Sequence, residues 1–260
     1  MKRAAGRRSW RWAALPWLTV AVLLAAWEAF ARSGAVTQFM LPALSAVLER
    51  IADDAASGDL AHGLGLTLYR SLVGFLIAAV AGIGCGMLFV RSRFARWWFD
   101  PIISVGFPMP KIAFLPVITL WLGFYDTAKI SMIVLDAAFP VVTATISGMM
   151  AVQKELVWSA RNLGASEGQL WWQIVLPASL PQVLTGLQVA LPISLIVCIV
   201  AEMKMGGAGL GAAMMSATRF ADSPGVFAGI VEIAAAGYAL VKAMALLRRR
   251  LLAWHPEALA

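Results

Sequence analysis

The sequence predicts an all-α polytopic membrane protein with about six transmembrane helices. Of its 260 residues, 61% are hydrophobic and only 13% are charged. Several apolar runs reach about 20 residues, the length that an α-helix needs to cross the hydrocarbon core of a bilayer. These runs are continuously apolar, whereas the strands of a membrane barrel alternate between apolar and polar residues, so we expect helices. Together these features exclude a soluble domain.

Residues 1–12 form a basic N-terminal segment, and the first span is expected at 13–31. One interpretation of this region is an ordinary membrane anchor. The other is a cleavable signal peptide, because a basic start and a short apolar core precede Ala29-Phe30-Ala31, and Arg7-Arg8 faintly resembles a twin-arginine signal. Cleavage would leave the later topology unchanged.

Residues 32–63 form an apparent loop outside the membrane, and its second half predicts a surface helix. Apolar residues fall on one helical face and charged residues lie elsewhere. The apolar set is Leu44, Val47, Leu48 and Ile51, and the charged set is Glu49, Arg50, Asp53 and Asp54. Such a helix is either a brace at the membrane interface or a contact surface for a partner protein.

A core of further spans is expected within 64–247, with boundaries set by capping and turn residues. Asp100 followed by Pro101 is typical of a helix N-cap and first turn, Asp126 or Thr127 caps the next helix, and Ser223-Pro224 opens the last one. The expected spans are 64–90, 100–122, 127–150, 180–202 and 224–247, followed by a C-terminal segment at 248–260.

The basic residues indicate how the chain is oriented. Thirteen lysines and arginines fall on the side of the membrane that holds the N-terminus, and four fall on the other side. An excess of positive charge marks the cytoplasmic face, so both termini are expected in the cytoplasm. The formal net charge of +7 could also suggest a protein that binds nucleic acid. The basic residues cluster at the ends of apolar runs, however, which indicates that they face a membrane surface.

Residues 151–178 interrupt the apolar chain with a polar segment on the cytoplasmic side. A short helix is expected to end at Gly164, which suits a left-handed backbone. Ser166 and Gln169 have the spacing of a capping box that starts a second helix. Leu176 precedes Pro177, so this helix is expected to stop there, with Ser179 and Pro181 opening the next span. The prediction is a stiff helix, turn and helix fixed to membrane spans at both ends.

This segment resembles the cytoplasmic motif of permease subunits of bacterial ATP-binding-cassette (ABC) importers. That motif has Glu-Ala-Ala, three residues, Gly, nine residues, Ile, one residue and Leu-Pro. Ala160, Gly164, Ile174, Leu176 and Pro177 occupy its positions here, Ala165 follows the glycine, and Trp158 and Ser159 replace the Glu and the first Ala. The resemblance implies that these residues couple the membrane helices to an ATPase, and the replacements leave the effect on docking open.

Two other stretches resemble the subgroup of nitrate, sulfonate and taurine importer permeases. The first is "FPMPKIAFLPVITLWLGF", through Pro108, Pro110, Pro116 and Gly123, and the second is "VAEM" followed by Gly209 to Gly211. The resemblance implies a type I importer permease (MetI-like) fold in the bacterial inner membrane. It also implies a homodimer of this chain in membrane lipid, two ATPase subunits that bind ATP and Mg²⁺, and a periplasmic binding protein that delivers the solute.

The residues themselves fit a subunit without its own catalytic, metal or cofactor site. The chain has no glycine-rich phosphate loop that ends in Lys-Ser or Lys-Thr, and Gly206 to Gly211 is expected to be a flexible outer loop. Cys85 and Cys198 lie in different spans and are expected to be small apolar residues. His62 and His255 are expected on opposite sides of the membrane, which excludes a shared metal site.

Ionisable residues within spans are candidates for the solute pathway because burying a charge in a bilayer is costly. Lys111, Asp136, Glu202 and Glu232 meet this criterion. Pro108 and Pro110 break the backbone ladder beside Lys111 and could open a polar lining. Lys111 either attracts an anionic solute, with Asp136 as counter-charge, or the charges are internal ion pairs or side chains that reach to the membrane surface from the ends of spans. Glu202 is expected to be exposed at the outer end of its span, with a gating, structural or solute-contact role.

Two other function classes are weighed against the permease. An ion-coupled secondary transporter would need coupling carboxylates and inverted repeats, and no convincing internal repeat occurs. A membrane-embedded enzyme would need a nucleophile-and-base or metal constellation, and neither paired histidines nor a serine elbow occurs.

Overall fold

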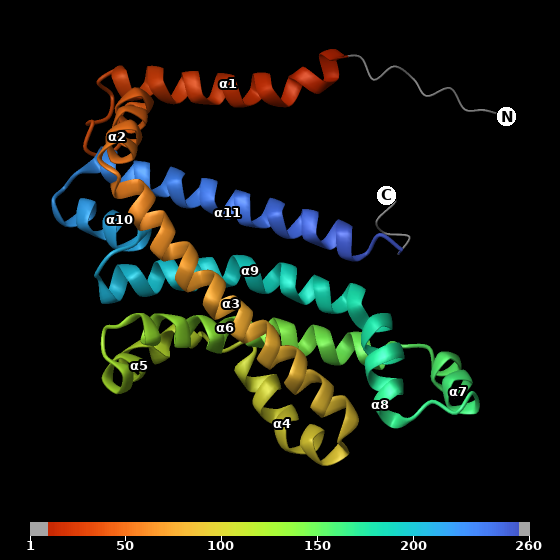
Figure 1. The fold of residues 1–260 in the computed structure, drawn as a ribbon. Coiled ribbons are helices and arrows are strands. Elements are labelled where there is room, and N and C mark those ends of the chain that lie inside the picture. Colours follow the sequence, from red (N-terminus) through yellow and green to blue (C-terminus); the bar gives the residue numbers. More distant parts are fainter. Residues whose placement is uncertain (1–9, 255–260) are drawn as a thin grey trace. The chain divides into compact units, whose positions relative to one another are not determined.

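The computed structural model describes residues 10–254, and this part of the chain is helical and contains no strand (Figure 1). Side chains are described from Leu15 onward. The expected basic residues Lys2, Arg3, Arg7 and Arg8, and His255, therefore lie outside the described residues. The elements are α1 (Trp10–Arg32), α2 (Leu44–Ser57), α3 (Asp59–Arg91), α4 (Arg93–Gly106), the 3-10 turn η1 (Lys111–Phe114), α5 (Leu115–Leu122), α6 (Asp126–Met150), α7 (Lys154–Asn162), α8 (Glu167–Gln169), the π-helical turn η2 (Leu170–Val175), α9 (Leu176–Met205), α10 (Leu210–Arg219) and α11 (Ser223–Leu251).

Five helical stretches among the described residues are long and apolar enough to cross a membrane. The bent pair formed by α4 and η1–α5 brings the number to six if it counts as one span. The fold class, an all-helical protein with about six spans, is therefore confirmed.

The third span differs from the expected single helix over 100–122. Its helix α4 already begins at Arg93, because Ser92 caps it by accepting a hydrogen bond from the Ala95 amide (3.2 Å). Asp100 and Pro101 lie inside α4, so the cap predicted there is wrong. The chain then bends by 95° after Gly106, across a stretch that holds Pro108 and Pro110.

The helix α10, which follows the glycine-rich stretch, was not predicted from the sequence, and the fifth span begins earlier than predicted, at Leu176. Ser179 and Pro181 lie within α9 and do not open it, and the Ser179 hydroxyl donates to the Leu176 carbonyl (2.9 Å). A serine that bonds back into its own helix does not need to cap a new one.

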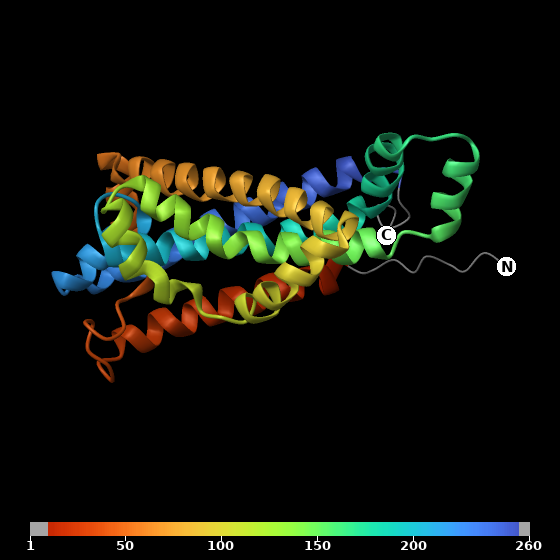
Figure 2. The ribbon, with the colours of Figure 1, turned by 90° about the horizontal axis from the view of Figure 1, so that it is seen from below.

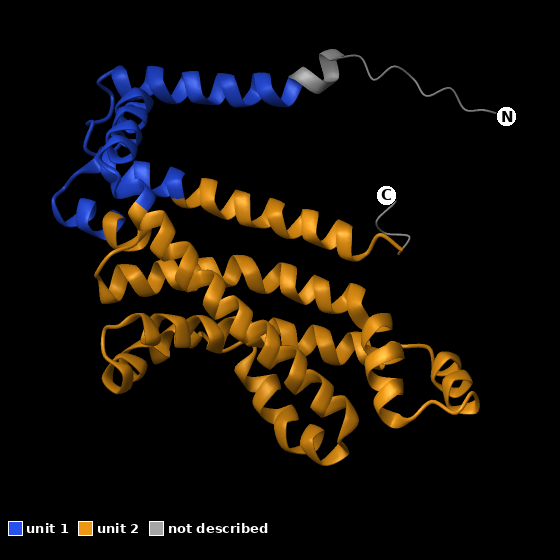
Figure 3. Ribbon diagram, viewed as in Figure 1, with its two compact units in different colours: residues 1–61, 214–232 blue, residues 62–213, 233–260 orange. Residues whose placement is uncertain are grey.

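The described chain divides into two compact units (Figure 3). The first unit comprises residues 1–61 and 214–232. In it, the Trp27 ring lies 5.9 Å from that of Phe227, and the Trp27 indole donates to the Pro42 carbonyl (3.1 Å). The helix expected in this region is present as α2, where Val47 is fully buried and Leu48 is exposed.

The second unit, residues 62–213 and 233–260, contains α6 and α9 side by side (Figures 1 and 2). Small residues allow this close approach: a Cβ atom on Gly186 of α9 would lie 2.4 Å from the Cβ of Ala144 and 2.9 Å from the carbonyl of Pro140. Lipid tails are as apolar as the helices, so the hydrophobic effect does not drive membrane helices together. Close packing of small residues drives their association instead.

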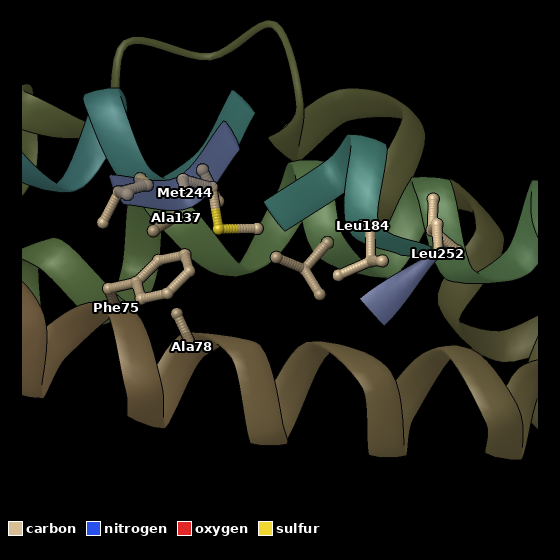
Figure 4. Close-up of a cluster of buried hydrophobic side chains, with 9 residues drawn as sticks. Phe75, Ala78, Ala137, Leu184, Met244 and Leu252 are labelled. Carbon is tan, nitrogen blue, oxygen red and sulfur yellow. The ribbon is translucent and has the colours of Figure 1, made fainter. Parts of the chain in front are cut away.

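A cluster of buried apolar side chains joins this helix pair to α3 and to the last part of α11. Figure 4 shows Phe75 and Ala78 of α3 facing Ala137 of α6, with Met244 beside them. The same cluster includes Leu184 of α9 and Leu252. The second unit thus has a core of its own, onto which the functional segments are attached.

We predict that Gly186→Ala lowers the stability of the purified protein by about 1–3 kcal/mol, because the added methyl group forces α6 and α9 apart. Thermal unfolding in detergent measures this loss. Gly84→Ala is the matched control: its Cβ would meet nothing within 4 Å, so it should leave stability unchanged or raise it by about 1 kcal/mol. Equal melting temperatures for both variants would contradict the packing described for Gly186.

Candidate functional site

The polar segment after α6 begins with the short helix α7, which ends in a left-handed turn. Gly164 has a φ of +84°, a conformation that a glycine adopts without a Cβ penalty. The Ala165 amide donates to the Ala160 carbonyl and the Gly164 amide to the Arg161 carbonyl, both at 3.0 Å. This pair of bonds is a Schellman motif, which satisfies carbonyls left free at the helix end. The helix end predicted at Gly164 is confirmed.

The second half of this segment starts with the predicted capping box. The Gln169 amide donates to the Ser166 hydroxyl (3.3 Å), and the Ser166 amide donates to the Gln169 side-chain oxygen (2.9 Å). The two bonds fix the direction in which the chain re-enters a helix immediately after the turn at Gly164.

The predicted stop at Leu176 is wrong, because helical structure continues without a break from Glu167 to Met205. The π-helical turn η2 connects α8 to α9, and the Leu176 amide donates to the Trp171 carbonyl. Pro177 lies in the first turn of α9, a position that tolerates its missing N–H. The segment is therefore continuous with the fifth span.

The residues of the importer motif divide between an internal and an exposed set. Ala160 is buried in a cluster with Met149, Leu170 and Val175, and Ala165, Ile174 and Leu176 pack against that cluster. Trp158, Ser159, Gly164 and Pro177 are exposed. The internal set ties α7 and η2 to α6, while the exposed set is free to contact another molecule.

Lys111 lies at the bend of the third span with its ammonium group fully engaged. Its Nζ lies 3.0 Å from a carboxylate oxygen of Asp136 and 3.1 Å from the Phe107 carbonyl, and 4.6 Å from the centre of the Phe139 ring. The ion pair with Asp136 is present, and both interpretations of Lys111 include this pair. Pro108 and Pro110 lie in the bend itself and are exposed.

Glu202 is fully buried, so the expected exposure at the end of its span is wrong. Its carboxylate accepts hydrogen bonds from Arg70 Nη1 (2.7 Å), the Thr67 hydroxyl (2.9 Å) and the Gly211 amide (3.1 Å). Cys198 is also buried, and its Sγ lies 3.6 Å from Oε1 of Glu202. Buried charge of this kind is tolerated only when paired and hydrogen-bonded, as it is here.

The same network extends to α6 and holds the glycine-rich stretch in place. Arg70 Nε donates to Asp126 (2.8 Å) and Arg70 Nη1 to the Ala208 carbonyl (2.5 Å), while Lys129 donates to the Gly206 carbonyl (2.8 Å). Two cations and two anions thus meet where α3, α6 and α9 come together. The stretch expected to be a flexible loop is anchored by these bonds.

Glycine is required within this stretch because the backbone passes directly over the Glu202 carboxylate. Gly209 has a φ of +133°, and a Cβ atom there would lie 2.3 Å from a carboxylate oxygen. The absence of a side chain at Gly209 therefore allows the backbone to pack against the buried carboxylate.

The geometry of the polar segment agrees with a comparison against known protein families. Residues 74–253 match the family described as binding-protein-dependent transport system inner membrane component. The chain belongs to this family. It is the permease subunit of a type I ABC importer, an inner-membrane component that works with an ATPase and a binding protein.

Curated relatives of this permease are similar over three quarters of the chain or more. The taurine transport permease of Escherichia coli is 33% identical, with 96% of this chain and 95% of the relative covered. A permease named for aliphatic sulfonate transport in Bacillus subtilis is 32% identical, with 98% and 92% covered. The nitrate import permease of Synechocystis is 33% identical over 75% of this chain and 74% of the relative.

Solved structures show the same fold at lower sequence identity. An amino acid ABC transporter superposes with a TM-score of 0.62 at 18% identity, covering 76% of this chain and 97% of the other. An inward-facing form of the MetNI methionine ABC transporter superposes with a TM-score of 0.57, also at 18% identity, covering 74% and 98%.

The sequence analysis identified Glu202 but missed the residues around it. Arg70 and Lys129 are ionisable residues in apolar helices, so the criterion that selected Lys111 applies to them equally. Asp126 was considered only as a cap, and Thr67 carries no charge to mark it. Glu232 lies in the first unit, where one buried carboxylate oxygen has no hydrogen-bond partner among the described residues, and it takes no part in this network.

We predict that Glu202→Gln lowers the stability of the permease by about 3–5 kcal/mol. The change leaves Asp126 to balance the buried Arg70 charge, and it turns the NH2 donor of the new amide toward groups that are themselves donors. Thermal unfolding in detergent measures the change. Glu167→Gln is the control: it breaks an exposed ion pair with Arg161 (2.9 Å), which should cost less than about 1 kcal/mol. A loss of similar size in both variants would argue against the network.

Proposed function

We propose that this permease carries a small anionic solute that a periplasmic binding protein delivers. Two copies of the chain form the pathway, and two separate ATPase subunits bind ATP and Mg²⁺, so this chain is itself non-catalytic. The names of its relatives support the solute class, since taurine, aliphatic sulfonates and nitrate share a compact anionic group.

The polar segment after α6 is the proposed coupling element. Its exposed face carries large apolar side chains, including Trp158, Leu163 and Trp172, which is typical of a protein interaction surface. The observation that carries the proposal is the unbroken helical path from Glu167 to Met205. A displacement of the docked end is therefore passed directly into a membrane helix.

The proposed orientation places this segment and both termini in the cytoplasm. Arg91, Lys154, Arg161 and the basic run Arg248–Arg250 then lie on one side, which agrees with the positive-inside rule. The first span is retained as an anchor in this proposal.

At the pathway itself, we assign Lys111 a supporting role. Its side chain is 7% exposed, and its ammonium group is already bonded to Asp136 and a backbone carbonyl, so it holds the bend of the third span in shape. The exposed backbone around Pro108 and Pro110 is then available to line the pathway. Glu202 is completely buried and supports the helices without contacting the solute.

We predict that Gly164→Val leaves the spans inserted but lowers binding-protein-stimulated ATP hydrolysis and uptake about tenfold, because a β-branched residue strains the left-handed turn. Gly164→Asn should retain most activity, since asparagine tolerates this conformation. Both quantities are measured in proteoliposomes at matched protein levels.

Gly168→Ala is the control for substitution in the same segment, because an added Cβ there would come no closer than 4.0 Å to its nearest neighbour. Normal uptake by Gly164→Val, or equal loss in Gly164→Asn, would show that the conformation of this turn is not needed for coupling.

For the solute, we predict that the reconstituted importer hydrolyses ATP several-fold faster when its binding protein carries a sulfonate or nitrate than when it is empty. Neutral and cationic amino acids that lack a sulfonate group should give no stimulation. The rate of phosphate release measures this, and stimulation by such amino acids alone would contradict the proposed class.

A further inference from the structure

The helix α4 presents two different faces. On one face, Ala95 packs with Phe89 of α3 and Val142 of α6, and the Phe99 ring stacks on that of Phe89 at 5.0 Å. The opposite face carries Phe94 and the tryptophans at 97 and 98, which are exposed. In Figure 1, α4 directly follows the end of α3 at Arg91.

Three arginines lie at this junction without a partner among the described residues. Arg91 ends α3, and Arg93 and Arg96 lie in the first turn of α4. None of their side chains forms a hydrogen bond or ion pair with a residue between Trp10 and Trp254, and the Nε of Arg96 is a buried donor without an acceptor. Because an unsatisfied buried donor is costly, this group calls for an acceptor from another molecule.

Arg93 and Arg96 share one side of α4 with the exposed Trp97. Arg93, Arg96 and Trp97 have the spacing i, i+3 and i+4, which places them on neighbouring positions of one face. The 33-residue α3, a candidate membrane span, ends at Arg91, so this face lies at the end of a span. Tryptophan in that position is typical of the boundary between lipid chains and head groups.

We propose that the α3–α4 junction binds the head group of an anionic phospholipid. Guanidinium groups bind phosphate oxygens in a bidentate manner, and Phe94, Trp97 and Trp98 offer an apolar surface to the acyl chains. Several arginines favour a lipid with net negative charge over a zwitterionic one. A second copy of this chain is a poor occupant, because a two-fold contact would bring the same arginines together.

The test is a lipid titration of the full-length permease in a mild detergent, followed by thermal unfolding. Phosphatidylglycerol should raise the melting temperature of the wild type, whereas phosphatidylcholine and inorganic phosphate should not. Arg93→Gln with Arg96→Gln should weaken the apparent affinity for phosphatidylglycerol roughly fivefold for each arginine removed.

The matched control removes two exposed arginines at another basic cluster, Arg249→Gln with Arg250→Gln, and should keep the wild-type response. If the first double variant does not fold, the single variant Arg96→Lys, which keeps the charge but loses the Nε donor, should show a smaller loss. An equal response to phosphatidylcholine, an equal shift with inorganic phosphate, or a wild-type response in the double variant would overturn the proposal. A change of oligomeric state in that variant would instead indicate a contact between copies and would also overturn it.

Discussion

A fully buried carboxylate, that of Glu202, constrains how three membrane helices meet. A charge without water must find its donors within the protein, and this one takes them from α3 and from the backbone that follows α9. Arg70 then needs a second acceptor, which Asp126 supplies from α6. The positions of these helix ends are thus mutually dependent. Gly209 follows from the need to bring backbone against the carboxylate, and Gly211 from the close approach of its backbone to the Ile199 carbonyl of α9.

The other end of the same helix pair is held differently. There, Met149 of α6 packs with Ala160, Leu170 and Val175, so apolar contacts replace the ionic network. Between the two ends, small residues keep α6 and α9 in close contact. Since packed helices move as rigid bodies more readily than they deform, a force on the proposed coupling segment would displace the pair as a whole. Pro181 and Pro192 within α9 each remove a backbone hydrogen bond and are the places where that helix can bend.

Local signals in the sequence predicted the local structure well. Gly164, Ser166 and Gln169 form the turn and the capping box that their spacing indicates, because both motifs depend only on residues close in the chain. The wrong predictions of helix starts and ends arose where a second local feature competes with the one that was used. Ser92 caps α4 ahead of Asp100, and the π-helical turn before Pro177 lets the helix continue. The partner of Glu202 lies 132 residues away, and no local pattern pairs two such positions, so the network could not be assembled from the sequence.

The two charge systems of the second unit differ in a way that bears on transport. Around Glu202, both partners of the central ion pair are buried, and breaking them apart would leave charges without water, so this system resists rearrangement. Asp136 keeps about a quarter of its side chain exposed, at 26%, and lies beside a bend in which two prolines leave backbone groups without helical partners. A carboxylate that is in contact with water loses less free energy of interaction when its partner moves away, because water solvates its charge. If either system changes during a transport cycle, these energetics favour the bend at Lys111 as the part that moves and the Glu202 network as the fixed frame against which it does so.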